Sequence, residues 1–100
     1  RDAGRVLIPV TVRAIGDLRD YFGRDPVVVE LPDAAVARDL LDAIDARWGA
    51  GLPAYLWDRE NRRFKGPVLL VIDKKAVQDE NAPLAAHTEI RLMRAIAGGS

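Results

Sequence analysis

The chain has 100 residues, 49% of them hydrophobic, so its length and composition suit one domain with a modest core. Its 15 basic and 15 acidic residues cancel, which argues against wholesale attraction to nucleic acid or to an anionic membrane. The absence of cysteine excludes disulfides, cysteine metal sites and thiol chemistry on this chain's side chains. The apolar runs are too short to span a bilayer and no signal-peptide pattern opens the sequence, so we expect a cytoplasmic protein.

Two strands are predicted in the first third of the chain, after a loose leader at residues 1–5. Residues 6–15 alternate, and the even positions are apolar, which indicates a strand whose even face meets the core. A turn or short helical piece is expected at residues 17–22, and a second strand at residues 27–31. Because the connection between the two strands is short, they are predicted to pair antiparallel.

The clearest helix is expected to begin after an N-cap at Asp33. Five apolar residues then fall on one stripe at helical spacing: Val36, Leu40, Leu41, Ile44 and Trp48. Gly49 and Gly51 should end this helix. Residues 52–66 are expected to form a long irregular segment with one helical turn around Tyr55.

Three further strands are predicted in the last third of the chain. Residues 68–72 are nearly all apolar, residues 73–75 should turn the chain, and a short strand should begin at residues 76–77. After a loop, the last strand covers residues 88–96. This order predicts an α+β fold of the β-grasp (ubiquitin-like) type, with a mixed four- to five-stranded sheet and one main helix across one face. We expect one such domain over residues 1–100.

The last strand is expected to lead into a flexible tail at residues 97–100. Gly98 and Gly99 lack Cβ atoms, so they add no side chain to the width of the tail. Such a tail can thread into a narrow slot on another protein, where a terminal carboxylate would be the reactive group.

Several stretches together resemble the MoaD/ThiS family of sulfur carriers. They are the runs at residues 12–23 and 68–77, Pro83-Leu84, and the ending I-R-L-M-R-A-I-A-G-G. The resemblance implies that an E1-like enzyme uses ATP to adenylate the carboxylate of Gly99, and that the adenylate becomes a thiocarboxylate. The carrier then gives its sulfur to a synthase, with molybdopterin synthesis as the first expectation. It implies no bound cofactor and no catalytic residues on this chain.

The same resemblance implies an apolar partner surface on the open face of the sheet, formed by Ile15, Ala76 and Met93. The strand alternation independently places Ile15 and Met93 on the side away from the helix. Three cations are expected to surround that patch and orient an acidic partner: Arg13, Arg91 and Arg94.

The sequence departs from the family in three places. Residues 86–89 read A-H-T-E where relatives often have a Gly-Asp-Glu turn, and Arg94-Ala95 stands where many relatives have proline. Ser100 follows the glycine whose carboxylate must be free. Either Ser100 is foreign to the natural protein, or a peptidase removes it before activation.

Other residues with chemical potential have plainer interpretations. We expect His87 to lie in an exposed loop without ligand-spaced companions. The acidic repeat and the basic run are expected to be solvated surfaces: Asp39, Asp42, Asp45, and Arg59, Arg62, Arg63, Lys65. Trp48 and Trp57 should pack in or beside the core, although Trp57 could instead face a partner.

Three alternatives to a molybdopterin carrier stay open from the sequence. The first is a carrier for thiamin or cysteine synthesis. The second is a ubiquitin-like modifier that attaches through Gly99 to lysines of other proteins. The third is an interaction module with an inert tail.

Overall fold

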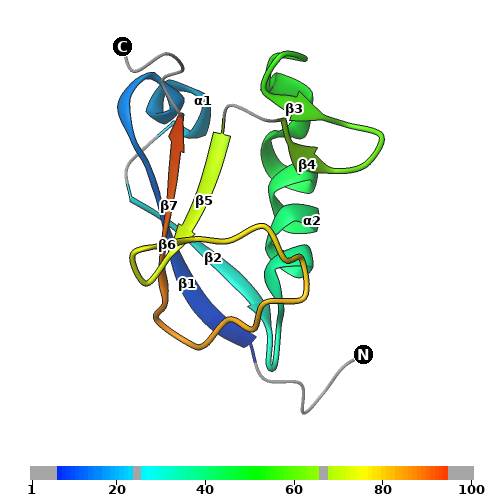
Figure 1. The fold of residues 1–100 in the computed structure, drawn as a ribbon. Coiled ribbons are helices and arrows are strands. Elements are labelled where there is room, and N and C mark those ends of the chain that lie inside the picture. The colour runs from blue at the N-terminus through cyan, green and yellow to red at the C-terminus, as the bar shows by residue number, and fades with distance from the viewer. Residues whose placement is uncertain (1–6, 24–25, 66–67, 95–100) are drawn as a thin grey trace.

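A five-stranded sheet with one long helix across one face forms the body of the protein (Figure 1). The computed structural model describes residues 7–23, 26–65 and 68–94. The strands of this sheet are β1 (Leu7–Ala14), β2 (Val27–Pro32), β5 (Val68–Ile72), β6 (Lys75–Ala76) and β7 (Glu89–Arg94). The helices are α1 (Arg19–Phe22) and α2 (Ala37–Trp48), with 3-10 turns η1 (Gly16–Leu18) and η2 (Gly49–Gly51). None of the helices in these ranges is long and apolar enough to cross a membrane.

The strand order is β2-β1-β7-β5-β6, with β1 and β7 side by side at the centre. These two strands run parallel, while β1–β2, β5–β7 and β5–β6 are antiparallel. A parallel neighbour requires a long crossover, and here α2 belongs to the chain that connects β1 to β7. The mixed sheet with one covering helix confirms the predicted fold class.

The core lies between this sheet and α2. The even positions of β1 are buried, as the alternation predicted, with Val10 fully enclosed. Leu40 and Ile44 of α2 are also fully enclosed, which confirms the apolar stripe of the helix. Trp48 lies at the helix end and is half-buried. Its ring packs edge-on against that of Phe22, with 4.9 Å between the ring centres.

The prediction that Asp33 caps the main helix is wrong. α2 begins at Ala37, and the N–H of the preceding residue, Val36, donates to the Asp39 carboxylate at 2.8 Å. The first N–H groups of a helix lack partners within it. Here carbonyl groups from a distant part of the chain act as the missing acceptors. The Ala37 N–H donates to the Ala82 carbonyl at 2.9 Å, and the Arg38 N–H donates to the Glu80 carbonyl at 2.8 Å.

The prediction of an irregular segment at residues 52–66 is also wrong in part. A turn closed by hydrogen bonds to the Pro53 carbonyl leads into a small hairpin of β3 (Trp57–Asp58) and β4 (Arg63–Phe64). Trp57 is 1% exposed, so it belongs to the core and does not face a partner. Its indole N–H donates to the Asp45 carboxylate at 2.9 Å, which fastens the hairpin to α2.

The short strand β6 begins at Lys75, one residue earlier than predicted. Asp73 and Lys74 both have positive φ, at 52° and 70°. Two positive φ values are typical of a two-residue hairpin turn that matches the twist of its strands. The turn therefore needs only these two residues, and Lys75 pairs with Ile72.

Candidate functional site

The face of the sheet that α2 leaves uncovered brings together most of the residues predicted to bind a partner. In the strand register Arg13 of β1 lies beside Arg91 of β7, Arg91 opposite Val71 of β5, and Val71 opposite Ala76 of β6. Directly opposed residues share a face of the sheet. Ala76, predicted from a single resemblance, therefore lies in one row with both arginines.

A second row lies one step closer to the end of β7. Met93 pairs with Leu69 of β5, and the Ile15 N–H donates to the Leu92 carbonyl at 2.9 Å. That bond extends the parallel ladder beyond Ala14 and places Ile15 beside Met93. Ile15 is 39% and Met93 37% exposed, so the row Ile15, Met93 and Leu69 presents apolar surface to solvent. We call these three residues the apolar row.

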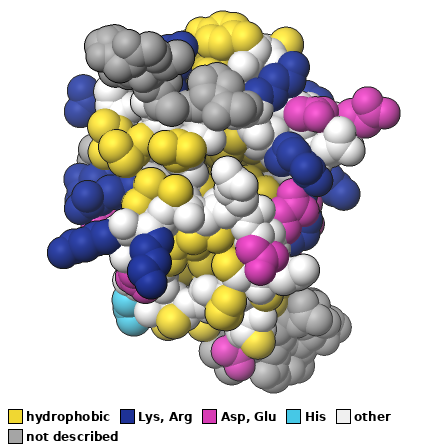
Figure 2. All heavy atoms as spheres, viewed as in Figure 1, with side chains coloured by type: hydrophobic (Ala, Val, Ile, Leu, Met, Phe, Trp, Pro, Cys, Tyr) yellow, Lys and Arg dark blue, Asp and Glu magenta, His cyan; other side chains and the backbone are white. Residues whose placement is uncertain are grey.

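Figure 2 shows hydrophobic side chains gathered over the upper parts of β5 and β7, with Lys and Arg side chains along the left edge of the molecule. Small soluble domains that expose contiguous apolar groups rimmed by polar ones often use them as interfaces. The arrangement suits a partner with an apolar centre and a charged margin.

The charged margin is built around one carboxylate. Glu89 of β7 accepts a hydrogen bond from Arg13 Nε at 2.9 Å and lies 3.6 Å from an Nη atom of Arg91. The hydrogen bond from Arg13 lowers the pKa of the Glu89 carboxyl, and Arg91 lowers it further. Glu89 therefore stays ionised near neutral pH and holds two guanidinium groups on the open face, leaving one net positive charge.

Arg94 does not lie with this group. It has the same parity along β7 as Ile90 and Leu92, which are fully buried on the helix side. Its guanidinium carbon lies 5.9 Å from the centre of the Tyr55 ring, within the usual range for a cation–π contact. The alternation along the last strand, read from the sequence, already implied that Arg94 lies on the helix side of the sheet.

Besides Glu89, two apolar residues of the face were not predicted from the sequence as part of the site: Leu69 and Val71. Both are half-buried and occupy the open side of β5. The signal was present, because a strand that is apolar at every position must present apolar groups on both faces. Gly98 and Gly99, the predicted reactive terminus, lie outside the described residues.

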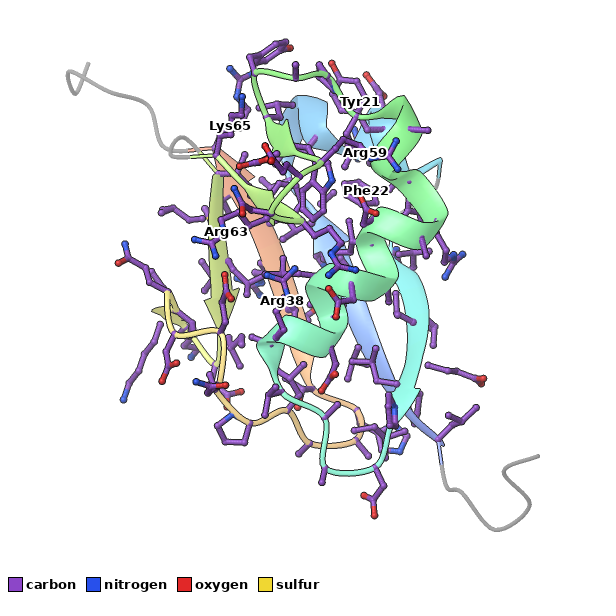
Figure 3. The ribbon with its side chains drawn as sticks, turned by 90° about the vertical axis from the view of Figure 1, so that its right-hand side faces the viewer. Tyr21, Phe22, Arg38, Arg59, Arg63 and Lys65 are labelled. Atoms are coloured by element: carbon purple, nitrogen blue, oxygen red, sulfur yellow. The ribbon has the colours of Figure 1, made fainter. Side chains whose placement is uncertain are left out.

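The remaining candidates have structural partners. Asp42 and Asp45 form ion pairs with arginines of α2 and the hairpin region, and Asp45 lies 3.0 Å from Arg59 Nε. Figure 3 shows Arg38, Arg59 and Arg63 along the side where the hairpin meets α2. The hydrogen bond from Trp57 is the main cause of a lowered pKa at the Asp45 carboxyl. Arg59 and Arg63 are exposed, as predicted for the basic run, whereas Asp45 is half-buried against Trp57 and does not belong to a fully solvated face.

His87 lies in an exposed loop, as expected, with its backbone N–H donating to the Pro9 carbonyl at 2.6 Å. Across residues 7–23, 26–65 and 68–94, no group of three or more potential ligands is placed to hold a metal ion.

Similar architectures occur among solved structures of small proteins. SAMP1 from Haloferax volcanii superposes with a TM-score of 0.72 at 21% identity, covering 91% of this chain and 99% of its own. The chain has the ubiquitin-like β-grasp fold. A Pyrococcus furiosus protein assigned as molybdopterin converting factor, subunit 1, shares this β-grasp fold (TM-score 0.68, 20% identity, 89% of this chain and 99% of its own). Urm1 from Trypanosoma brucei does so at TM-score 0.66 and 14% identity, over 93% and 97%.

Comparisons with models of protein families and with curated sequences find no match. At these identities the structural likeness concerns the β-grasp fold, and it agrees with the fold that the MoaD/ThiS resemblance implied.

Proposed function

We propose that this chain is a sulfur carrier whose Gly99 carboxylate is adenylated by an E1-like enzyme, converted to a thiocarboxylate and used to donate sulfur, most directly in molybdopterin synthesis. The observation that carries the proposal is the position of the tail relative to the open face. Gly99 follows Met93 of the apolar row by six residues, which span at most roughly 20 Å when extended. A partner docked on this face therefore has the glycines within reach of its active site.

In the proposed reactions the only group of this chain that reacts is the carboxylate of Gly99. A carboxylate oxygen of Gly99 would attack the α-phosphorus of ATP and release pyrophosphate, giving an acyl adenylate. A sulfide donor would then attack the acyl carbon and expel AMP. Glycine suits both steps because no side chain crowds the carbonyl carbon. The catalytic groups and the ATP site belong to the partner, so this chain acts as a co-substrate in the cytoplasm, where ATP is supplied.

The side chains on the open face indicate which groups a partner needs on its binding surface. The apolar row fits an apolar patch on the activating enzyme and on the synthase, and Arg13 with Arg91 fits a carboxylate at its margin. Ser100 must be removed by a peptidase if it belongs to the natural chain. Molybdopterin synthesis is our first assignment because the chain is longer than thiamin carriers usually are. The thiamin and cysteine routes are the alternatives.

A protein modifier is the second candidate. Three of the similar structures, the SAMP1 structure reported above among them, are of small archaeal modifier protein 1 (SAMP1), from Haloferax volcanii and from Methanosarcina acetivorans. A modifier would use the same adenylation at Gly99 but would pass the acyl group to a lysine amine of another protein.

Intact-mass measurement of the chain, purified from its own organism, separates these candidates. A carrier predicts a fraction ending at Gly99 with sulfur in place of one terminal oxygen. A modifier predicts isopeptide-linked adducts on other proteins. A variant lacking Gly98 and Gly99 is the matched control and should lose both products. If every molecule retains Ser100 and no adduct forms, both candidates fail and an interaction module remains.

A further inference from the structure

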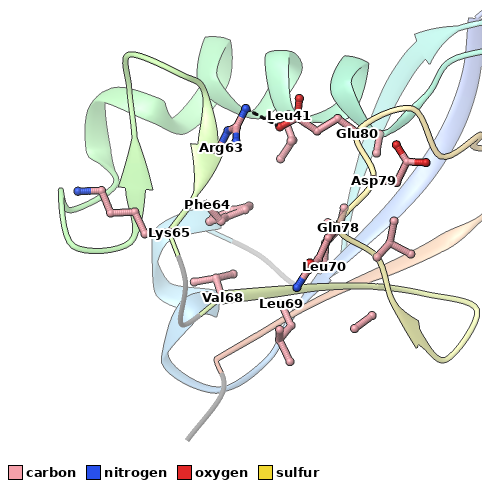
Figure 4. A pocket seen from close by; sticks show the side chains of 13 residues that line it. Leu41, Arg63, Phe64, Lys65, Val68, Leu69, Leu70, Gln78, Asp79 and Glu80 are labelled. Atoms are coloured by element: carbon pink, nitrogen blue, oxygen red, sulfur yellow. Dashed lines mark ion pairs between the residues drawn. The ribbon is translucent and has the colours of Figure 1, made fainter. Parts of the chain in front are cut away.

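An apolar groove runs along the outer side of β5, between the sheet edge and the hairpin (Figure 4). Its volume is about 230 Å³. Side chains from α2, β4, β5 and the chain after β6 contribute apolar surface to it: Leu41, Phe64, Val68, Leu70 and Val77. Phe64, Leu70 and Val77 are only half-buried, so they keep surface available to an occupant.

The charge at the helix side of this groove is already paired. Glu80 lies 3.2 Å from an Nη atom of Arg38 and 3.0 Å from one of Arg63. Its carboxylate therefore has two cations and does not call for a charged ligand. Small-molecule and cofactor sites usually occupy roughly 300 to 1,000 Å³, and this groove is smaller. It suits one or two uncharged apolar side chains on an extended chain.

The chain's own C-terminal segment has that chemistry and starts beside the groove. Arg94, the last described residue, pairs directly with Val68, which lines the groove. Residues 95–99 read A-I-A-G-G, without charge and with one large apolar side chain at Ile96. Five extended residues span at most roughly 17 Å. Neighbouring strands are about 4.8 Å apart, so a path from β7 across β5 falls well within that reach.

We propose that residues 95–99 dock in this groove of the same molecule, with Ile96 as the apolar anchor. A docked tail is held against the hairpin side of the sheet and is hidden from a partner on the open face. An enzyme that must take up the tail binds only molecules in which the tail is undocked. Its apparent affinity is therefore reduced in proportion to the fraction of such molecules. The inference does not rest on the sulfur-carrier function, because docking requires only the apolar segment and the groove.

A paramagnetic label on the tail tests the proposal directly. The chain has no cysteine, so Ala97→Cys accepts a single nitroxide label. Val77 in the groove is compared with Ile15, which also lies near the end of β7 but on the opposite face. Docking predicts much stronger broadening of the Val77 NMR signals than of the Ile15 signals. Equal broadening at the two positions, or stronger broadening at Ile15, would overturn the proposal.

A second measurement needs no label. Chemical shifts of Leu41, Leu70 and Val77 methyl groups should differ between the full chain and a chain truncated after Arg94. Ile96→Ser should move them toward the truncated values. Identical shifts in all three proteins would overturn the proposal and leave the groove to a partner's segment. Shift differences that vanish on tenfold dilution would assign the occupant to a second copy, which also contradicts docking within one molecule.

Discussion

Replacing Ile15 and Met93 by alanine together tests whether the apolar row is the docking surface of the proposed carrier. Ile15 keeps 39% and Met93 37% of its surface exposed in the free protein. Fully burying such a side chain stabilises by about 1.5 to 3 kcal/mol, so burying the exposed remainder contributes about 0.6 to 1.2 kcal/mol for each. Losing most of this should weaken partner binding by about 1 to 2 kcal/mol, or about 5- to 30-fold in Kd.

The assay is calorimetric titration of each variant with the adenylating enzyme of the same organism. Leu7→Ala with Val28→Ala is the matched control, because these residues are 52% and 54% exposed on the same face but outside the apolar row, Leu7 at the far end of β1 and Val28 opposite Thr11 on the edge strand β2. The control pair should bind like the unmodified chain. Thermal unfolding of both pairs shows whether each variant is folded at the temperature of the titration. If the two folded pairs bind equally well, the reasoning that locates the partner at the apolar row is refuted.

Three further predictions concern how the hairpin is fixed to α2. Trp57→Ala should lower the free energy of unfolding by about 3 to 5 kcal/mol, because it leaves a cavity at an enclosed site. Tyr55 is exposed, so Tyr55→Ala should change this free energy by about 0.5 kcal/mol or less. Equal effects of the two substitutions in denaturant titrations would contradict this prediction. The folded state lowers the pKa of Asp45, so its contribution is present above the ordinary value of 3.8 and is lost as pH falls below it. Asp45→Asn should therefore flatten the acid limb of a stability-versus-pH curve, and an unchanged limb would exclude that role. Gly49→Ala should destabilise by about 1 to 3 kcal/mol in thermal unfolding, since a Cβ there clashes with the Asp45 carboxylate; wild-type stability would show that the carboxylate moves freely.

The local pattern of the sequence predicted the faces of the elements well. Alternation in the first and last strands identified their buried sides, because successive side chains in a strand point to opposite faces whatever lies beside it. The same rule put Ile15 and Met93 on the open face and would have put Arg94 on the other. The helix stripe was equally local, since residues three and four apart share a side of a helix.

Element boundaries that depend on distant parts of the chain were predicted poorly. α2 begins at Ala37 because carbonyls of Glu80 and Ala82 accept its first N–H groups. The hairpin at residues 57–64 exists because Trp57 packs into the core and binds Asp45. No short window of sequence contains both members of such contacts, so a propensity argument could not find them.

The sequence by itself determined the strands of the main sheet and the main helix, apart from their exact ends, which side of each is apolar, and that two glycines follow the last strand. Only the tertiary structure decided which side chains become neighbours across strands. Arg13 and Glu89, 76 positions apart, share an ion pair because β1 and β7 pair in parallel in one register. A shift of that register by one residue would turn every side chain to the other face. The packing of α2 against the buried sides fixes this register, and with it the apolar row.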